Sequence, residues 1–214
     1  MARDHTIQIR DHIVRLAYYS GHKGYEPIWE HPNNAELREK RPDPGVLGLG
    51  DQVHVPDAPP WVFERLPTRR EHQLVLDLPH PRVRLRLLRP GFVPFGGQAC
   101  HARFDDDSET QTPDGDGQVE FEIGPDTIFV TLAVDQQEVE LDIAALAPLD
   151  TMAGLTARLE NLGYEPGPLG PDDKPEDTYG FRMAAEEFQC DHGLLVDGVI
   201  GPKTMVMLAG VHGA

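Results

Sequence analysis

The spacing of apolar and polar residues predicts strands in the middle of the chain and helices toward both ends. From residue 71 to residue 143, apolar positions alternate with polar ones, a period of two that is typical of half-buried strands. The alternating runs are 74–78, 83–87, 119–123, 128–134 and 139–143. Turn residues separate them, notably the Asp-Gly-Asp-Gly sequence at 114–117. Short strands at this spacing predict a small β-sandwich over residues 71–147.

The last third of the chain has helical spacing instead. Leucines three and four residues apart lead to a glycine that suits a helix C-terminus: Leu155, Leu159, Leu162 and Gly163. A second helix is expected over residues 177–190, ended by Gly193. Pro202 suits the first turn of a third helix. Three short helices joined by glycine turns predict a small bundle.

The same region carries a motif pattern: Gly154-Leu155, Arg158-Leu159, Leu162-Gly163-Tyr164, Phe188-Gln189, Gly193-Leu194, Asp197-Gly198, Gly201-Pro202 and Thr204. Its order and spacing closely resemble the peptidoglycan-binding-like domain, a three-helix module that docks enzymes and machines onto bacterial cell wall. The resemblance implies a peptidoglycan ligand, with Tyr164, Gln189 and Asp197 as candidate ligand-binding residues. Gln189 and Asp197 have a second interpretation, as residues that hold turns together, because Asp-Gly is a turn signal.

Two features depart from the family pattern. Leu169-Gly170 stands where the family usually has a first Asp-Gly turn, and an acidic insertion at residues 171–177 follows it. Phe181 replaces the threonine expected seven residues before Phe188. We expect the fold to survive both changes, which bear mainly on binding specificity.

The first 56 residues predict a strand, helices and a closing strand. Residues 6–9 alternate as a short strand, and Asp11 suits the N-cap of the helix that follows. Further helical turns are expected at Ile28-Trp29 and from Pro32 to Lys40. A Gly50-Asp51 turn then leads into an alternating strand at 52–55.

This βααβ order, with its closing Gly-Asp turn, resembles a LysM domain, a small glycan-binding module of cell-wall proteins. The resemblance implies glycan-facing loops at residues 10–13 and 47–50. The candidate ligand-binding residues there are Arg10, Asp11, His12, Gly48 and Gly50. LysM-like domains also serve as assembly parts in the baseplates of phage-tail-like machines, so a structural role is the alternative.

The predicted fold class is therefore α+β and multidomain. A LysM-like domain spans residues 1–56, and a proline-rich linker spans 57–70. The β-sandwich over 71–147 resembles the transthyretin-like type, which usually acts as a spacer. A three-helix peptidoglycan-binding-like bundle covers residues 148–214.

Charge narrows the range of partners. The chain has 36 acidic and 19 basic residues, a formal net charge of −17. A surface this acidic repels nucleic acid phosphate and anionic lipid, so neither is an expected partner. We expect no membrane span and no cleaved signal peptide. Synthesis in the cytoplasm, then export by a contractile or type VI machine or release by lysis, is the expected route.

The sequence offers no sign of catalysis. It lacks the G-x-S-x-G, H-E-x-x-H and P-loop motifs, so we expect neither an enzyme nor a cofactor. Asp105, Asp107 and Glu109 alternate like calcium ligands, but the required glycine is missing. Cys100-His101 has no second Cys or His pair to complete a zinc site. Cys100 and Cys190 are expected to be free thiols, with one disulfide as the alternative.

Three functions remain open from the sequence. The leading hypothesis is a non-catalytic peptidoglycan-binding or targeting protein. The first alternative is a structural adaptor of a contractile injection or type VI secretion apparatus, with spike, baseplate or effector proteins as partners. The second alternative is a targeting subunit of a separate wall hydrolase.

Overall fold

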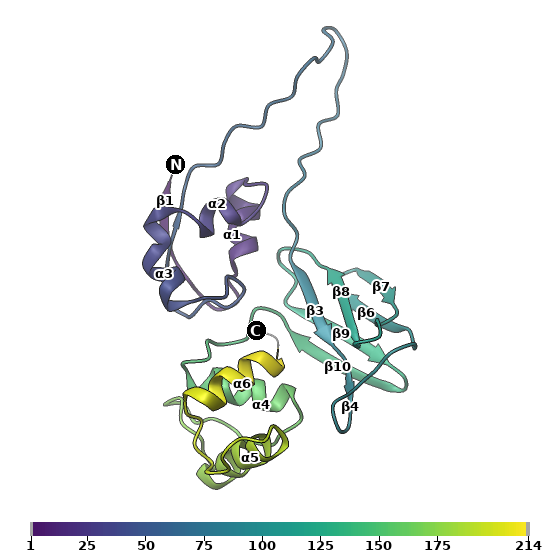
Figure 1. Cartoon of the computed structure of the whole chain (residues 1–214). Coiled ribbons are helices and arrows are strands. Elements are labelled where there is room, and N and C mark those ends of the chain that lie inside the picture. Colours follow the sequence, from purple (N-terminus) through teal and green to yellow (C-terminus); the bar gives the residue numbers. More distant parts are fainter. Residues whose placement is uncertain (1, 213–214) are drawn as a thin grey trace. The chain divides into compact units, whose positions relative to one another are not determined.

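The computed structural model describes residues 2–212, and Figure 1 shows its helices and strands. The chain divides into two compact units. The first contains Met1–Glu39 and Leu49–Ala145, and the second contains Lys40–Gly48 and Leu146–Ala214. Helices and several small sheets are both present, which confirms the predicted α+β class. Residues 40–48 lie within the predicted 1–56 domain but belong to the second unit.

Two short strands that are distant in sequence close the N-terminal part. β1 (Arg3–Thr6) pairs antiparallel with β2 (Gln52–Val55). Between them run α1 (Ile13–Ser20), α2 (Glu26–Trp29), the 3-10 helix η1 (Pro32–Asn34) and α3 (Ala35–Lys40). The buried apolar side chains of this part are Ile7, Ile13, Leu16, Ala17, Ile28, Leu37, Val53 and Val55.

A buried carboxamide fastens these elements together. Asn34 is 1% exposed, and its Nδ2 donates to the carbonyls of Ile28 at 2.7 Å and His54 at 2.8 Å. Its Oδ1 accepts the His54 N–H at 2.7 Å. One side chain therefore satisfies backbone groups of both α2 and β2, which buried polar groups require.

Two expectations for the first twelve residues are wrong. The strand predicted at 6–9 ends at Thr6, because the chain turns there: the Asp11 N–H donates to the Gln8 carbonyl at 3.1 Å. The N-cap of α1 is His12 rather than Asp11, and its Nδ1 accepts the Arg15 N–H at 3.2 Å. The Asp11 carboxylate is instead used by side chains and by the Gln8 N–H.

The middle of the chain is rich in strands. The strands are β3 (Arg82–Arg86), β4 (Leu88–Arg89), β5 (Val93–Pro94), β6 (Cys100–Phe104), β7 (Asp107–Gln111), β8 (Gln118–Glu122), β9 (Phe129–Val134) and β10 (Gln137–Asp142). They form a four-stranded sheet of order β10-β9-β6-β7 and two-stranded sheets β3-β8 and β4-β5. The β3-β8 pair and the four-stranded sheet share one apolar core, centred on Cys100, Ala102, Phe104, Val119, Phe121, Ile123, Val130 and Leu132.

The alternating pattern found β3, β8, β9 and β10 but failed at one run. Residues 74–78 form no strand, and the whole stretch from Pro56 to Pro81 lacks regular secondary structure (Figure 1). The irregular stretch thus extends beyond the predicted linker at 57–70. The short strands β4 and β5 and the central strand β6 were also not predicted. Nor was β7, because the residues of this edge strand are all polar.

The C-terminal unit holds three helices among the described residues: α4 (Met152–Asn161), α5 (Thr178–Asp191) and α6 (Pro202–His212). Thr151 caps α4 by accepting the Gly154 N–H at 3.0 Å. After α4 the chain reverses at Gly163, whose φ of +90° favours glycine. The buried apolar side chains here are Leu155, Leu159, Tyr164, Ala184, Ala185, Phe188 and Leu208.

A buried arginine joins α4 to the chain before it. Arg158 is 1% exposed, and its Nη1 donates to the carbonyls of Ala147 at 2.8 Å and Gly154 at 2.9 Å. Burial lowers the pKa of this guanidinium, and the charge of Asp43 opposes that effect. Arg41 Nη1 lies 2.8 Å from Asp150 Oδ1, and this ion pair links residues 40–48 to the rest of the second unit.

The start of α4 has no space for a side chain at Gly154. An added Cβ would lie 2.0 Å from the Pro148 carbonyl oxygen and 2.6 Å from that of Ala147. We expect Gly154→Ala to lower the free energy of unfolding by about 2 kcal/mol, as overpacking does. Urea denaturation followed by circular dichroism measures the change.

Gly210 in α6 provides the matched control, because its added Cβ would meet nothing within 4 Å. Gly210→Ala should stabilise the protein by up to about 1 kcal/mol through helix propensity. Equal effects of the two substitutions would contradict the packing described for Gly154.

Candidate functional site

Gln189 organises the loop between α5 and α6. Its side chain is 1% exposed, and its Oε1 accepts the N–H groups of Asp197 at 3.0 Å and Gly198 at 2.9 Å. Its Nε2 donates to Asp197 Oδ1 at 2.9 Å and to the Val199 carbonyl at 3.0 Å. One carboxamide therefore fixes residues 197–199 against α5.

Asp197 and Gly198 complete this arrangement. Asp197 Oδ1 also accepts the Val199 N–H at 2.9 Å, and this bond, followed by the one from Gln189, lowers the pKa of Asp197. Gly198 has a φ of +69°, and an added Cβ would lie 2.5 Å from Cγ of Arg182. The hydrogen bonds of Asp197 thus favour its ionised form, and the positive φ of Gly198 favours glycine.

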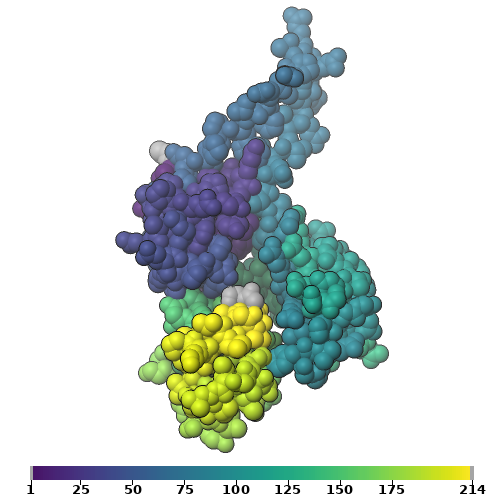
Figure 2. All heavy atoms as spheres, in the orientation of Figure 1, coloured from purple at the N-terminus to yellow at the C-terminus, as the bar shows by residue number. Residues whose placement is uncertain are grey.

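The fixed loop exposes apolar side chains. Leu195 is 80%, Val196 50% and Val199 64% exposed. On α5, Tyr179 is 70% and Met183 37% exposed. We call these five residues the apolar surface group; α5, near the lower edge of Figure 2, lies at the surface of its unit in that view. Large exposed apolar patches mark binding surfaces, so these exposed residues are candidates for contact with a ligand.

Tyr164 occupies a different environment from Gln189 and Asp197. It is 7% exposed, its hydroxyl donates to Asp191 at 3.1 Å, and its ring meets Phe188 edge-on at 5.7 Å. Burial, together with Asp191, raises the pKa of Tyr164, so its hydroxyl stays protonated. The structure brings Gln189 and Asp197 together and places Tyr164 in the core of the unit.

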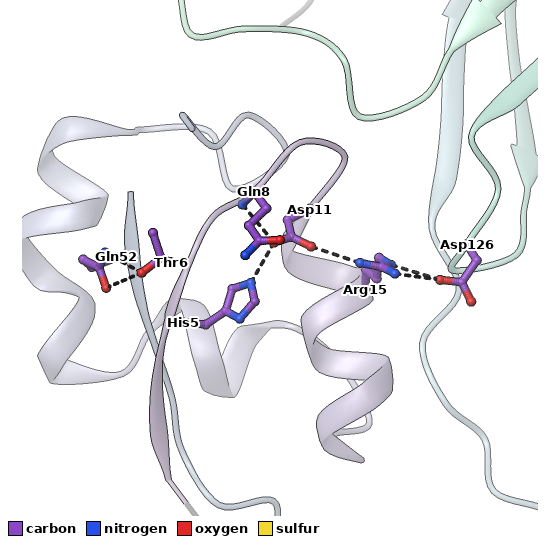
Figure 3. Close-up of polar contacts among 7 residues, drawn as sticks. All are labelled: His5, Thr6, Gln8, Asp11, Arg15, Gln52 and Asp126. Atoms are coloured by element: carbon purple, nitrogen blue, oxygen red, sulfur yellow. Dashed lines mark hydrogen bonds and ion pairs between the residues drawn. The ribbon is translucent and has the colours of Figure 1, made fainter. Parts of the chain in front are cut away.

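Among the N-terminal candidates, Asp11 carries a buried carboxylate, which Figure 3 shows with its partners. Asp11 Oδ2 contacts His5 Nε2 at 2.7 Å and accepts the Gln8 N–H at 3.0 Å, while Oδ1 accepts from Arg15 at 3.0 Å. Arg15 also donates to Asp126 at 3.0 Å. Sequence analysis selected Asp11 but missed His5 and Arg15. The i,i+4 spacing of Asp11 and Arg15 was the only available signal.

The other N-terminal candidates are arranged as follows. Arg10 has a φ of +69°, and its guanidinium lies over the Phe129 ring at 4.9 Å and 3.5 Å from Asp142. Gly50, with a φ of +84°, donates its N–H to the Ile7 carbonyl at 2.9 Å.

That bond sets Gly50 beside the turn that leads to Arg10, within the first unit. Two apolar side chains flank these positions: Ile9 is 79% exposed and Leu49 is 74% exposed. Gly48 is buried and lies in the 40–48 segment of the second unit.

Residues 2–212 contain no group of three or more His, Cys, Asp or Glu side chains that could hold a metal ion. Cys100 is buried, Cys190 is exposed, and both are free thiols. No helix within those residues has the length and apolar character needed to cross a bilayer.

Comparison with known families adds one finding. A family model described as "Putative peptidoglycan binding domain" matches residues 152–208. The matched stretch runs from the first residue of α4 into α6 and includes Gln189, its loop and the apolar surface group. Residues 152–208 are therefore a peptidoglycan-binding-like domain. No curated protein and no solved structure matches the chain.

The Asp11 carboxylate makes the N-terminal part sensitive to acid. Burial alone would raise the pKa of Asp11, but the hydrogen bonds from His5 and Gln8 and the nearby positive charges outweigh it and lower that pKa. A lowered pKa in the folded state gives stability that is complete above the ordinary value of about 3.9 and lost as pH falls through the folded value.

Asp11→Asn should therefore lower the free energy of unfolding of the N-terminal part by about 1–3 kcal/mol at pH 7. The difference from wild type should shrink below about pH 4. Hydrogen exchange of the α1 amides at pH 7 and pH 3.5 reports the change. The exposed Asp106→Asn serves as a charge-matched control, and a loss that is the same at both pH values would refute the ionised role of Asp11.

Proposed function

We propose that the protein is a non-catalytic peptidoglycan-binding protein whose residues 152–208 dock it onto the cell wall. The family match to those residues is the observation that carries the proposal. It is supported by the way Gln189 satisfies the backbone of its loop from within, which leaves that loop free to direct side chains outward.

The apolar surface group suits the chemistry of the polymer. The sugar rings of peptidoglycan present C–H faces that stack on aromatic side chains, and its lactyl and alanyl groups carry methyls that pack on aliphatic ones. Tyr179 supplies the aromatic ring, and Leu195 and Val199 supply aliphatic contacts. These contacts need no net positive charge, which agrees with a chain of net charge −17.

A sedimentation assay with purified, insoluble peptidoglycan tests the proposal. The wild-type protein should co-sediment, and the double variant Leu195→Ser/Val199→Ser should lose at least about tenfold in affinity, about 1.4 kcal/mol. Both side chains are mostly exposed, so the variant should keep its melting temperature. Wild-type sedimentation no greater than that of an unrelated acidic protein would refute the function.

Val206→Ser provides the matched control, because Val206 is 75% exposed on α6 and lies outside the apolar surface group. It should bind as wild type does. If Val206→Ser and the double variant lose binding equally, the polymer contacts a different face of the unit. Absence of soluble fragments after long incubation with the polymer would support the non-catalytic role.

We also propose that residues 1–56 act as a LysM-like second module that binds glycan. The proposal is supported by the run of short helices between β1 and β2, by the pairing of these two strands, and by exposed Ile9 and Leu49 next to the predicted loops. Two weak sites on one chain raise the apparent affinity for a repeating polymer.

Titration with a soluble N-acetylglucosamine oligomer, followed by amide NMR shifts, tests the second module alone. Shifts should concentrate around residues 9–13 and 49–50 and disappear in Ile9→Ser/Leu49→Ser. The exposed Tyr19→Ser on the C-terminal turn of α1 is the control. Shifts confined to residues 152–208 would refute glycan binding by the N-terminal module and leave the first proposal intact.

A further inference from the structure

Residues 73–77 have the pattern of a strand but lie in no sheet of the described chain. The sequence Gln-Leu-Val-Leu-Asp has its two leucines two residues apart, as on one face of a strand, yet the structure leaves it extended and unpaired (Figure 1). Leu74 and Leu76 are each 48% exposed and Val75 is 74% exposed. A segment with strand periodicity and exposed leucines is a candidate for pairing with a sheet edge.

The sheet β3-β8 has an unoccupied edge on the β3 side. Leu87 N–H donates to the Gly117 carbonyl at 2.8 Å, and Ile123 N–H donates to the Pro81 carbonyl at 3.0 Å. Antiparallel pairing alternates, so odd-numbered β3 residues direct their backbone groups toward β8. The backbone N–H and C=O groups of Arg82, Arg84 and Arg86 therefore face the other side, where no strand of residues 2–212 lies.

The apolar side chains of β3 are also only partly covered by the rest of the described chain. Val83 and Leu85 point into the sandwich core but are only partly buried. A further antiparallel strand beside β3 would cover them if its apolar residues lay directly opposite.

We propose that two copies of the chain exchange residues 73–77, each segment pairing antiparallel with the open β3 edge of the other copy. The register that fits places Leu76 opposite Val83 and Leu74 opposite Leu85. Asp77 then lies opposite Arg82, an attractive pair. The apolar pairs fall at non-hydrogen-bonded positions, where side chains are closest, and the backbone of the even-numbered arginines gains its partners.

The connection to β3 explains why the segment reaches a second copy rather than its own strand. Folding back in this register leaves residues 78–81 as a four-residue turn, which is usually built around a type I turn. That turn needs a near-helical residue at its third position, here His80. His80 precedes Pro81, and a residue before proline is disfavoured in the helical region. The two prolines in Leu-Pro-His-Pro thus hold the segment away from its own β3, the arrangement that favours exchange of an element between copies.

Mixed single-cysteine variants test the exchange directly. In a Cys190→Ser background, Leu76→Cys and Val83→Cys are made in separate chains, mixed and oxidised. Exchange predicts a disulfide-linked dimer from the mixture, because the two positions face each other across strands of different copies. The matched control mixes Val75→Cys with Val83→Cys, whose side chains would lie on opposite faces, and should give at least tenfold less dimer.

The unmodified protein gives an independent readout. Light scattering should report twice the mass of one chain, and Leu74→Ser/Leu76→Ser should raise the dimer dissociation constant at least tenfold without changing the monomer's circular dichroism. A monomeric wild type at high micromolar concentration would overturn the proposal. An intramolecular disulfide in a chain carrying both Leu76→Cys and Val83→Cys would also overturn it, because the segment would then pair with its own β3.

Discussion

Two buried carboxamides hold the parts of this protein on which its proposed activity depends. Asn34 bridges α2 and β2, and Gln189 fixes residues 197–199 against α5. Each is 1% exposed, and each pairs with backbone donors and acceptors of other segments. A buried carboxamide left without its partners costs about 1–3 kcal/mol, so conformations that separate these segments from Asn34 or Gln189 are less stable. A neutral amide is suited to this role because it both donates and accepts without the desolvation cost of a charge.

Within the 194–200 loop, polar and apolar groups face in different directions. Its polar atoms point inward to Gln189, and three of its apolar side chains point outward. A loop already held in one conformation loses little entropy when a polymer lands on it. Under the proposed function, Gln189 and Asp197, selected as candidate ligand residues, would contribute through the shape of the loop, and the exposed positions would touch the wall.

The spacing of apolar residues predicted helices and strands best where one face of the element is buried. The three C-terminal helices and the strand at 52–55 were found because their apolar spacing and their glycine or proline boundaries agree. The pattern missed β4, β5, β6 and the polar edge strand β7. It also failed at residues 74–78, which have no partner strand in the described chain. His5 was missed because the fold, not the sequence spacing, brings it to Asp11, whereas the i,i+4 spacing of Arg15 from Asp11 was a sequence signal left unused. Tertiary pairing cannot be read from local periodicity.

The discontinuous make-up of the second unit affects how the chain folds. Residues 40–48 belong to it together with residues 146 onward, so about a hundred residues separate its two pieces. Bringing such distant pieces together costs on the order of 4 kcal/mol of loop-closure entropy. Contacts between residues so far apart in sequence slow folding. The ribosome must also synthesise all the strands of the middle region before Arg41 can pair with Asp150. The C-terminal helical unit therefore includes residues 40–48, which the ribosome synthesises about a hundred residues before the helices.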